Sequence, residues 1–552
     1  MPIYYEIQSM RKFIFLLSSL FSLGSNAQTK TPPKLVVGIV VDQMVVDYLY
    51  RFNSRFSKGG FRLLMEKGVN VRNAQFNYIP TYTGPGHASI YTGTTPNNHG
   101  IVANNWYDRS AEEGTGCVDD SMYFSVGTES NYGVRSPKNM KCLSITDQLK
   151  LTYPNSKVLS MSIKDRGAIL PGGHLSDGSY WYDYLTGKFV TSEYFMKELP
   201  SWVDDFNDKG YPLKSMEGTW NTMHPLKTYT ASGPDDSPYE VSIAGKSAPV
   251  FPYAFGDYEL SESSQFSYFT YTPWANTYLT DFALQGMKKE KLGKDASTDF
   301  LCISYSTPDN AGHAFGPQSV EIEDMYLRLD LEIQKLIAQA QKWTNGEVVF
   351  FLTADHAVVP VPQKLTDQKL PGGYLFTNDL LTNLHDAVKG KFGADVVSTL
   401  MNNNIYLNEK TIEFMGLNEK EVEDFVAAEI RKWPGVKLVM TSEQLSNPNL
   451  ANLHAEQLKR GYDAYRSGNV IFSLEPGYLK KSKDSEDARK GTNHGSGHQY
   501  DTHVPLLFYG SGIPAKEVYQ QIDITDIAPS LALLLNLQMP NCSTGRPIVE
   551  LF

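Results

Sequence analysis

The chain has few cysteines, no excess of basic residues and, after its N-terminus, no long apolar run. Only 4 of its 552 residues are cysteine, and they form no Cys-x-x-Cys pair, which argues against a cysteine-based zinc site. The formal net charge is −11, whereas a nucleic-acid surface would show basic clusters. No later segment is apolar enough to span a bilayer. We therefore expect no dedicated nucleic-acid partner and no stable membrane anchor.

The N-terminus has the pattern of a secretory signal peptide. A short positive stretch at Arg11 and Lys12 precedes the apolar run 13–23, and Ser25-Asn26-Ala27 is a small-residue cleavage site. The run is short for a membrane-spanning helix. We expect a signal peptide over residues 1–27 and a periplasmic or secreted mature protein, with the start codon left open between Met1 and Met10.

The cysteines can oxidise in such a compartment. Cys117 and Cys142 could then pair, although the sequence leaves the pairing of Cys117, Cys142, Cys302 and Cys542 open. Cys302 lies inside the apolar run 300–305, so we expect it to pack as a small buried hydrophobe.

Apolar, β-rich runs alternate with helical patterns along the chain. The segment 319–342 carries apolar residues at a helical period, and 523–537 is a second candidate helix. This alternation predicts an α/β fold with a doubly wound, mostly parallel central sheet and helices on both faces. Ligands in such folds bind beyond the carboxyl ends of the strands. The runs expected to form buried strands are 35–41, 157–163, 300–305, 348–352 and 505–509.

Two stretches interrupt this alternation, at about residues 171–297 and 363–490. The first is rich in Tyr, Trp, Pro, Gly and Ser with little periodicity, and the second holds a helical piece near 419–432. We expect one domain over residues 28–552, in which both stretches are excursions from the core sheet that form a cap over the site.

Metal-binding side chains follow several of the strand-like runs. A carboxylate at the end of a buried strand is unfavourable unless it leaves the core or binds a cation. Taken singly, Asp42 would be better explained as a helix N-cap, and each histidine as a surface or core residue. Together, these aspartates and histidines favour two zinc sites of mixed ligation. The candidate ligands are Asp42, Asp309, His313, Asp355, His356 and His494.

The segment Thr83-Gly84-Pro85-Gly86-His87 predicts a tight turn into a helix. A hydroxyl near the helix N-terminus lies where the helix dipole and free N–H groups favour an alkoxide and a bound anion. A threonine can attack at neutral pH when a metal lowers its pKa. We expect Thr83 to be the nucleophile and His87, one turn further on, to support the site. A hydrolase that transfers phosphoryl or sulfuryl groups is the leading interpretation.

The order Asp, Thr, Asp-x-x-x-His, Asp-His and His resembles the alkaline phosphatase superfamily, from about Leu35 to Ile548 apart from the two insertions. The resemblance implies a zinc ion held by Asp309, His313 and His494, and another held by Asp42, Asp355 and His356. It also implies that Thr83 bridges toward the substrate.

Two further segments are similar to the periplasmic, phosphate-irrepressible alkaline phosphatases of the PafA type. They are 99–104, which ends in Asn104, and 162–167, which carries Lys164 and Arg166. The resemblance implies that these three side chains contact phosphoryl oxygens, as lysine and arginine can through charge-assisted hydrogen bonds.

The sequence therefore predicts a secreted, monomeric, di-zinc alkaline phosphatase that hydrolyses small phosphate monoesters through a phosphothreonine on Thr83. One alternative is a phosphodiesterase or nucleotide pyrophosphatase of the same superfamily. A sulfatase would need a cysteine or serine in place of Thr83. A noncatalytic metal-binding protein is a further alternative, although it would not need a threonine among glycines.

Overall fold

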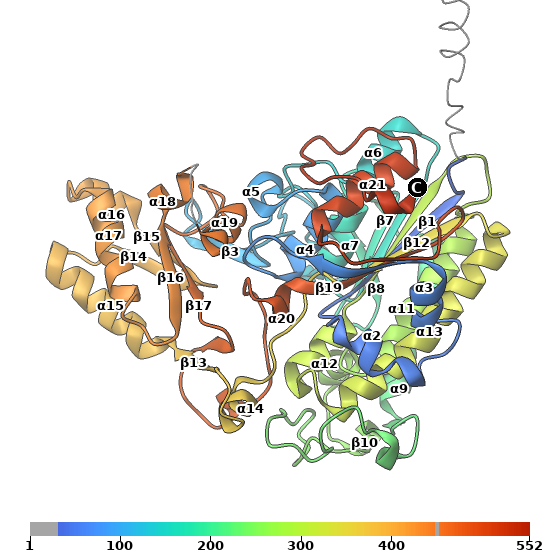
Figure 1. The fold of residues 1–552 in the computed structure, drawn as a ribbon, viewed down its shortest axis with the longest axis horizontal. Coiled ribbons are helices and arrows are strands. Elements are labelled where there is room, and N and C mark those ends of the chain that lie inside the picture. Colours follow the sequence, from blue (N-terminus) through green and yellow to red (C-terminus); the bar gives the residue numbers. More distant parts are fainter. Residues whose placement is uncertain (1–30, 448–451) are drawn as a thin grey trace, which may run out of the picture. The chain divides into compact units, whose positions relative to one another are not determined.

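A large mixed β-sheet organises the chain (Figure 1). The computed structural model describes residues 31–447 and 452–552, so the expected signal peptide, residues 1–27, lies outside the described residues. Within these ranges the sheet has 11 strands, and its middle consists of neighbouring parallel strands. In spatial order they are β12 (Val348–Thr353), β1 (Leu35–Val41), β11 (Asp299–Tyr305) and β6 (Val158–Ser162).

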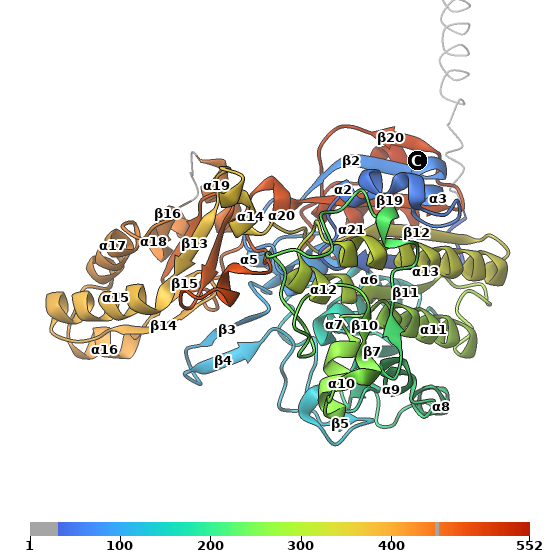
Figure 2. The same cartoon turned by 90° about the horizontal axis from the view of Figure 1, so that it is seen from below.

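All four of these strands are buried along their whole length, as their apolar runs predict. Helices α4 (Thr83–Thr92) and α7 (Asp165–Gly172) lie on one face of the sheet (Figure 1). Helices α11 (Pro273–Lys289) and α13 (Val320–Thr344) lie on the other, as Figure 2 also shows. The predicted α/β class, with a mostly parallel sheet covered on both faces, is confirmed.

Helix α13 shows how local sequence produces this packing. Ser319 caps its N-terminus by accepting a hydrogen bond from the N–H of Ile322. Its apolar residues recur at a helical period and are buried against the sheet and α11, among them Ile322, Met325 and Leu329. The helix ends at Thr344, and the left-handed backbone of the next residue, Asn345 (φ 54°), closes the last turn.

The sheet differs from the prediction at two places. The run 505–509 lies in β19 (His503–Gly510), which pairs antiparallel with both of its neighbours rather than parallel. An apolar run reports burial, but not strand direction. In addition, β7 (Gly178–Tyr182) and β8 (Phe189–Ser192) extend the central sheet although they fall within the predicted insertion 171–297. Both strands are buried throughout, but their aromatic and polar side chains do not form the apolar run from which a buried strand is predicted.

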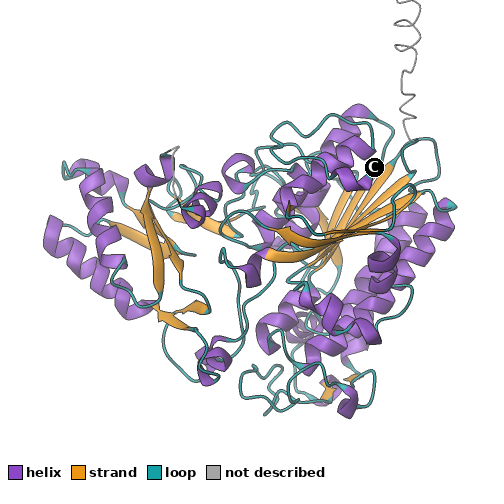
Figure 3. Ribbon diagram, viewed as in Figure 1, coloured by secondary structure: helices purple, strands orange, loops and turns teal. Residues whose placement is uncertain are grey.

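The second predicted insertion has a sheet of its own (Figure 3). It also has a separate hydrophobic core. Its described residues build an antiparallel sheet in the order β14 (Val397–Met401), β15 (Asn404–Leu407), β17 (Val470–Leu474) and β16 (Val436–Thr441). Helix α17 (Glu419–Ile430) packs on this sheet and matches the predicted helical piece.

One disulfide joins distant parts of the chain. Cys142 pairs with Cys542, across 400 positions of sequence. The suggested pairing of Cys117 with Cys142 is therefore wrong, and Cys117 is a free, buried thiol. Cys302 is also free and buried in β11, as its apolar surroundings predict. Within the described ranges, every helix is too short or too polar to cross a lipid bilayer.

We expect the Cys142–Cys542 bond to stabilise the fold. A native disulfide that closes a long loop typically contributes about 2–4 kcal/mol, so the double variant Cys142→Ala, Cys542→Ala should unfold several degrees lower in differential scanning calorimetry. A reductant should lower the midpoint of the wild-type protein and leave that of the double variant unchanged. An equal response of both proteins to the reductant would contradict the pairing.

Candidate metal centre

Neighbouring strands deliver the acidic residues to one place. Asp42 directly follows β1, Asp355 and His356 follow β12, and Asp309 and His313 lie on α12 (Thr307–Phe315), which follows β11. The carboxyl ends of adjacent parallel strands meet at one edge of a sheet, which is where α/β folds bind ligands.

His494 reaches the same edge from a loop ahead of β19. Because β19 runs antiparallel to β12, its beginning lies beside the end of β12. A parallel β19 would have put this loop at the opposite edge of the sheet. The direction of β19, which the sequence did not reveal, is therefore what brings His494 to the site.

The candidate ligands form two overlapping groups. Asp42, Asp355 and His356 offer ligand atoms within 4.8 Å of one another, and so do Asp309, His356 and His494. His313 adjoins the second group, because its Nε2 lies 3.1 Å from Asp309 Oδ1. The grouping implied by the resemblance assigned His356 to one site alone. In the structure its ring also stacks on that of His494, with centroids 3.5 Å apart.

Three imidazoles are oriented in the same way. The Nδ1 atoms of His313, His356 and His494 lie 3.0, 3.0 and 2.7 Å from the backbone oxygens of Thr492, Ala357 and Thr81. Such a bond holds the proton on Nδ1 and leaves the Nε2 lone pair free for a metal. Burial lowers the pKa of His356 to about 3, which keeps this ring neutral, as a metal ligand must be.

The carboxylates carry negative charge that the protein offsets only in part. Asp42 Oδ1 and Asp355 Oδ2 are buried and have no hydrogen-bond partner among the described residues. Burial and the charge of Asp42 raise the pKa of Asp355 well above its usual range. Buried anionic oxygens without partners are unfavourable unless a cation binds them. The oxygen and nitrogen donors present therefore fit two divalent cations.

Lys164 lies among these carboxylates. It follows β6, the fourth of the adjacent parallel strands, and its Nζ is 2.7 Å from Asp42 Oδ2 and 2.5 Å from Asp309 Oδ2. The ammonium thus bridges one carboxylate of each group. These two carboxylates outweigh burial and raise the pKa of Lys164, so the side chain is fully charged at neutral pH.

Arg166 and Asn104 flank the centre with unused donors. The Nε of Arg166 is buried and unpaired within the described part of the chain, although its guanidinium lies 3.6 Å from the Asp165 carboxylate. Asn104 Oδ1 accepts a hydrogen bond from the N–H of Gly84 at 2.7 Å. That bond fixes the amide and directs its NH₂ group elsewhere.

Thr83 is the first residue of α4, and its Oγ1 lies 3.5 Å from His356 Nε2. The helix approaches so closely that a Cβ on Gly86 would lie 2.2 Å from the carbonyl oxygen of Asp355. Only glycine permits that approach. The turn into a helix is as predicted, but two of the N–H groups expected to be free at its start are engaged. Gly84 N donates to Asn104, Gly86 N donates to the carbonyl of Tyr82, and Pro85 has no N–H.

The remaining histidines of the motifs support the site from outside it. His87 Nδ1 is 2.9 Å from the Thr83 carbonyl, and its Nε2 is 2.8 Å from Ser304 Oγ on β11. Both ring nitrogens are therefore engaged, in agreement with the predicted supporting role. His498 Nε2 lies 3.0 Å from the Leu474 carbonyl of β17, so this residue ties the loop of His494 to the second insertion.

Gln43 is a residue that the sequence analysis missed. Its Nε2 donates to Asp309 Oδ1 at 2.5 Å, and its backbone N–H donates to Asp355 Oδ1 at 3.3 Å. Its backbone is left-handed, with φ at 65°, a conformation that is uncommon and unfavourable for a residue other than glycine. Only its position directly after Asp42 hinted at a role.

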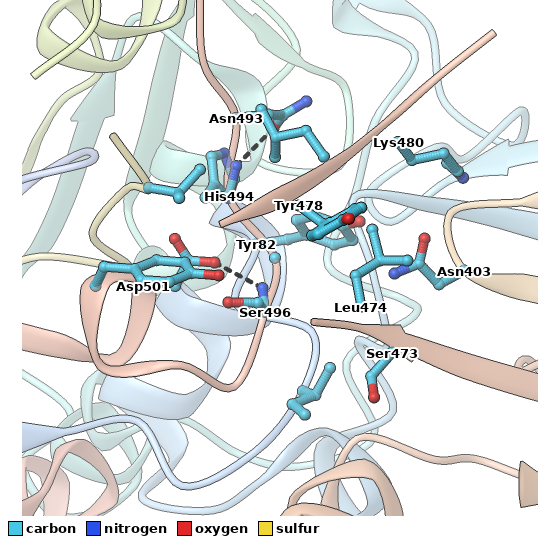
Figure 4. Close-up of a pocket in the computed structure, with 15 residues that line it drawn as sticks. Tyr82, Asn403, Ser473, Leu474, Tyr478, Lys480, Asn493, His494, Ser496 and Asp501 are labelled. Carbon is cyan, nitrogen blue, oxygen red and sulfur yellow. Dashed lines mark hydrogen bonds between the residues drawn. The ribbon is translucent and has the colours of Figure 1, made fainter. Parts of the chain in front are cut away.

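A pocket opens beside the centre (Figure 4). His494 and Tyr82 line it from the core, and their rings meet edge to face with centroids 5.6 Å apart. Asn403, Tyr478 and Lys480 line it from the second insertion. The insertion therefore borders the metal centre.

Comparison with known proteins identifies relatives along nearly the whole chain. Residues 36–501 match the family model described as type I phosphodiesterase / nucleotide pyrophosphatase. Alkaline phosphatase PafA of Elizabethkingia meningoseptica is 38% identical over 96% of each chain. Alkaline phosphatase PhoV of Synechococcus elongatus is 38% identical over 95% of this chain and 94% of the relative. A protein of Myroides odoratus named calcium-transporting ATPase is 39% identical over 97% of this chain and 98% of its own.

A crystal structure of wild-type alkaline phosphatase PafA superposes with a TM-score of 0.89 and 38% identity, covering 94% of this chain and 99% of that one. A solved PafA variant carries replacements of a threonine, an asparagine, a lysine and an arginine, in that order along its chain. These relatives and the family model span the strands that build the centre. The chain therefore belongs to the alkaline phosphatase superfamily and, within it, to the PafA-type alkaline phosphatases.

Proposed function

We propose that this protein is a di-zinc phosphomonoesterase in which Thr83 attacks phosphorus and carries the phosphoryl group as a phosphothreonine. The observation that supports this most strongly is the convergence of three carboxylates, three oriented imidazoles and one threonine hydroxyl at a single edge of the sheet. The names of the PafA and PhoV relatives point to the same activity.

Asp42, Asp355 and His356 would hold one zinc ion, and Asp309, His313 and His494 the other. Ligation rich in imidazole nitrogen suits zinc better than magnesium, which prefers oxygen donors. When bound, the two ions would supply Lewis-acid chemistry that lowers the pKa of a nearby hydroxyl and offsets charge on phosphoryl oxygens.

Thr83 would act as the nucleophile. Its Oγ1 forms a bond to phosphorus while the bond to the leaving-group oxygen breaks, and water later displaces the threonine to release phosphate. The short side chain at the start of α4 has little freedom, because the Gly86 contact fixes the helix against Asp355. His87 holds the Thr83 carbonyl and further restricts this residue.

Asn104, Lys164 and Arg166 would bind the phosphoryl oxygens. The NH₂ group of Asn104 and the Nε of Arg166 have no hydrogen-bond partner among the described residues and can donate to a substrate. Lys164 lies beside both groups of ligands, and its charge becomes available to a phosphoryl oxygen once cations offset the carboxylates. The replaced residues of the PafA variant are of the same types and occur in the same order as Thr83, Asn104, Lys164 and Arg166, and in both chains the lysine and arginine are two positions apart.

A phosphodiesterase is the second candidate, because the matching family model bears that description. A monoester dianion carries one more negative charge than a diester. Two cationic side chains around the phosphoryl group favour the dianion, and we therefore prefer the monoesterase.

We also propose that the protein works in an oxidising compartment, in the periplasm or outside the cell. The Cys142–Cys542 disulfide supports this location, as does the signal-peptide pattern of residues 1–27. The monomeric state stays a prediction.

Metal removal should abolish phosphatase activity. A chelator should also lower the thermal midpoint, because Asp42, Asp309 and Asp355 would lose the cations that offset their charge. Zinc should restore both activity and midpoint better than magnesium does, with metal content measured on the same samples. Full activity in protein shown to be free of metal would refute the two-zinc centre.

Replacement of the nucleophile should separate chemistry from metal binding. Thr83→Ala should lower kcat/KM for an aryl phosphate by roughly a thousandfold or more while the metal content is maintained, and Thr83→Ser should remain active. Thr92→Ala is a matched control, because it removes a buried hydroxyl from the other end of α4 that donates to the Ala88 carbonyl. Near wild-type turnover by Thr83→Ala would instead indicate direct attack by water.

Arg166→Ala should impair monoester hydrolysis more than diester hydrolysis. One charge-assisted hydrogen bond is worth about 1.5–3 kcal/mol, so kcat/KM for an aryl phosphate should fall roughly tenfold or more relative to its methyl diester. Arg72→Ala is the control, because the Arg72 guanidinium pairs with Glu517 at the edge of the sheet, and this variant should change both substrates by the same factor. If Arg166→Ala lowered kcat/KM for the monoester and the diester by the same factor, the result would favour the phosphodiesterase.

A further inference from the structure

The pocket beside His494 has two chemically different ends (Figure 4). Toward one end lie His494, Asn493 and Asp501, next to the metal centre. Toward the other lie Asn403 and Lys480, with Tyr478 and Leu474 between the two ends. The carboxylate in the lining, that of Asp501, accepts a hydrogen bond from Ser496 N at the metal end.

Asn403 differs from the asparagines on either side of it. Asn402 Nδ2 donates to the Asn105 carbonyl, and Asn404 Oδ1 accepts from Gly468 N, so both side chains hold the β14–β15 turn in place. The side-chain amide of Asn403 makes no hydrogen bond to any described residue, and it faces the pocket. Nothing in the turn requires an amide at this position.

Lys480, on β18 (Tyr478–Lys481), is a half-buried cation without a counter-charge. Its ammonium has no hydrogen bond or ion pair within residues 31–447 and 452–552, and burial alone lowers its pKa, to about 8. An ammonium removed from water is unfavourable unless an anion joins it. The described residues supply no such anion, so the geometry leaves room for an anion from outside.

The in-line geometry of phosphoryl transfer indicates that the leaving group reaches this pocket. Thr83 Oγ1 lies 3.5 Å from His356 Nε2, whereas His494, a candidate ligand of the other ion, stacks its ring on that of His356 and lines the pocket. Phosphoryl transfer places the entering and leaving oxygens roughly in line on opposite sides of phosphorus. A leaving group displaced by Thr83 would therefore point toward His494 and into the pocket.

We propose that this pocket binds the leaving group, and that Lys480 and Asn403 select phosphate monoesters whose leaving group carries a second anionic group on an apolar or aromatic body. Tyr82, Tyr478 and Leu474 would contact the apolar body, Asn403 would donate a hydrogen bond, and Lys480 would pair with the second anion. This inference rests on the proposed phosphomonoesterase function and names the substrate class of that same site.

Matched substrates that differ in one charge test the proposal. Carboxyphenyl phosphate and carbamoylphenyl phosphate, both para-substituted, have nearly the same shape, and the corresponding biphenyl pair reaches further along the pocket. At pH 7, below the pKa of Lys480, the wild-type enzyme should prefer the carboxylate in at least one pair by roughly tenfold in kcat/KM, which corresponds to about 1.4 kcal/mol. Lys480→Met should remove this preference, and Lys480→Arg should retain it.

Lys481→Met is the control, because Lys481 is the adjacent lysine of the same strand but does not line the pocket. The Lys481→Met variant should prefer the carboxylate substrate by the same factor as the wild-type enzyme. Thermal midpoints check that each variant is folded, and Lys480→Gln replaces the methionine variant if that one is not. No preference for the carboxylate in either pair, or a preference that survives in folded Lys480→Met, would overturn the proposal.

Binding separates this proposal from the proposed function. Arylphosphonates with the same para substituents are not hydrolysed, and their dissociation constants can be measured by calorimetry on the zinc-loaded protein. Absence of turnover with every phosphate would contradict the phosphomonoesterase, whereas the phosphonates would still report the charge preference and its dependence on Lys480. Equal dissociation constants for the charged and neutral phosphonates would count against the pocket.

Discussion

Mutual repulsion among Asp42, Asp309 and Asp355 is the constraint on which the centre depends. Three carboxylates buried at one edge of a sheet are stable only beside positive charge. Lys164, which follows strand β6, supplies part of it. One oxygen each of Asp42 and Asp355 has no hydrogen-bond partner among the described residues, so cations would have to supply the remainder. The same constraint explains Gln43, whose amide bonds to Asp309 and whose N–H bonds to Asp355 from an unfavourable backbone conformation.

Close packing of the backbone brings the residues of the candidate centre within reach of one another. Gly86 lets α4 rest on the carbonyl of Asp355, and a Cβ on Gly312 would lie 2.0 Å from Gln43 Oε1. Glycine is required at these two positions because neighbouring atoms occupy the space of a side chain, and not because the backbone has a positive φ. The two glycines bring Thr83 to His356 and let Gln43 reach the first turns of α12. Close contacts in two different helices, α4 and α12, thus position Thr83 and Gln43 beside the candidate ligands.

The sequence could place Asp42, Asp309, Asp355 and His356 together because they follow buried strands, and strand ends meet where the fold class dictates. Other features could not be predicted. An apolar run carries no direction, so the antiparallel course of β19 was missed together with its consequence for His494. Gln43 has no distinctive neighbours, and its role depends on a backbone angle. The Cys142–Cys542 pairing depends on the return of the chain after 400 positions, which no local pattern encodes.

The second insertion is coupled to the chemistry through one loop. That loop supplies His494, and it is fastened to the insertion by His498, which bonds the Leu474 carbonyl, and by Tyr500, whose hydroxyl accepts from Gly477 N at 3.0 Å. The segment that orients a metal ligand therefore also positions the walls of the adjacent pocket. Strands of the core sheet position the charged residues of the candidate centre, whereas the insertion lines the adjacent pocket. Because the two share this loop, a change in the insertion that displaced β17 or β18 would alter the position of His494 as well as the shape of the pocket.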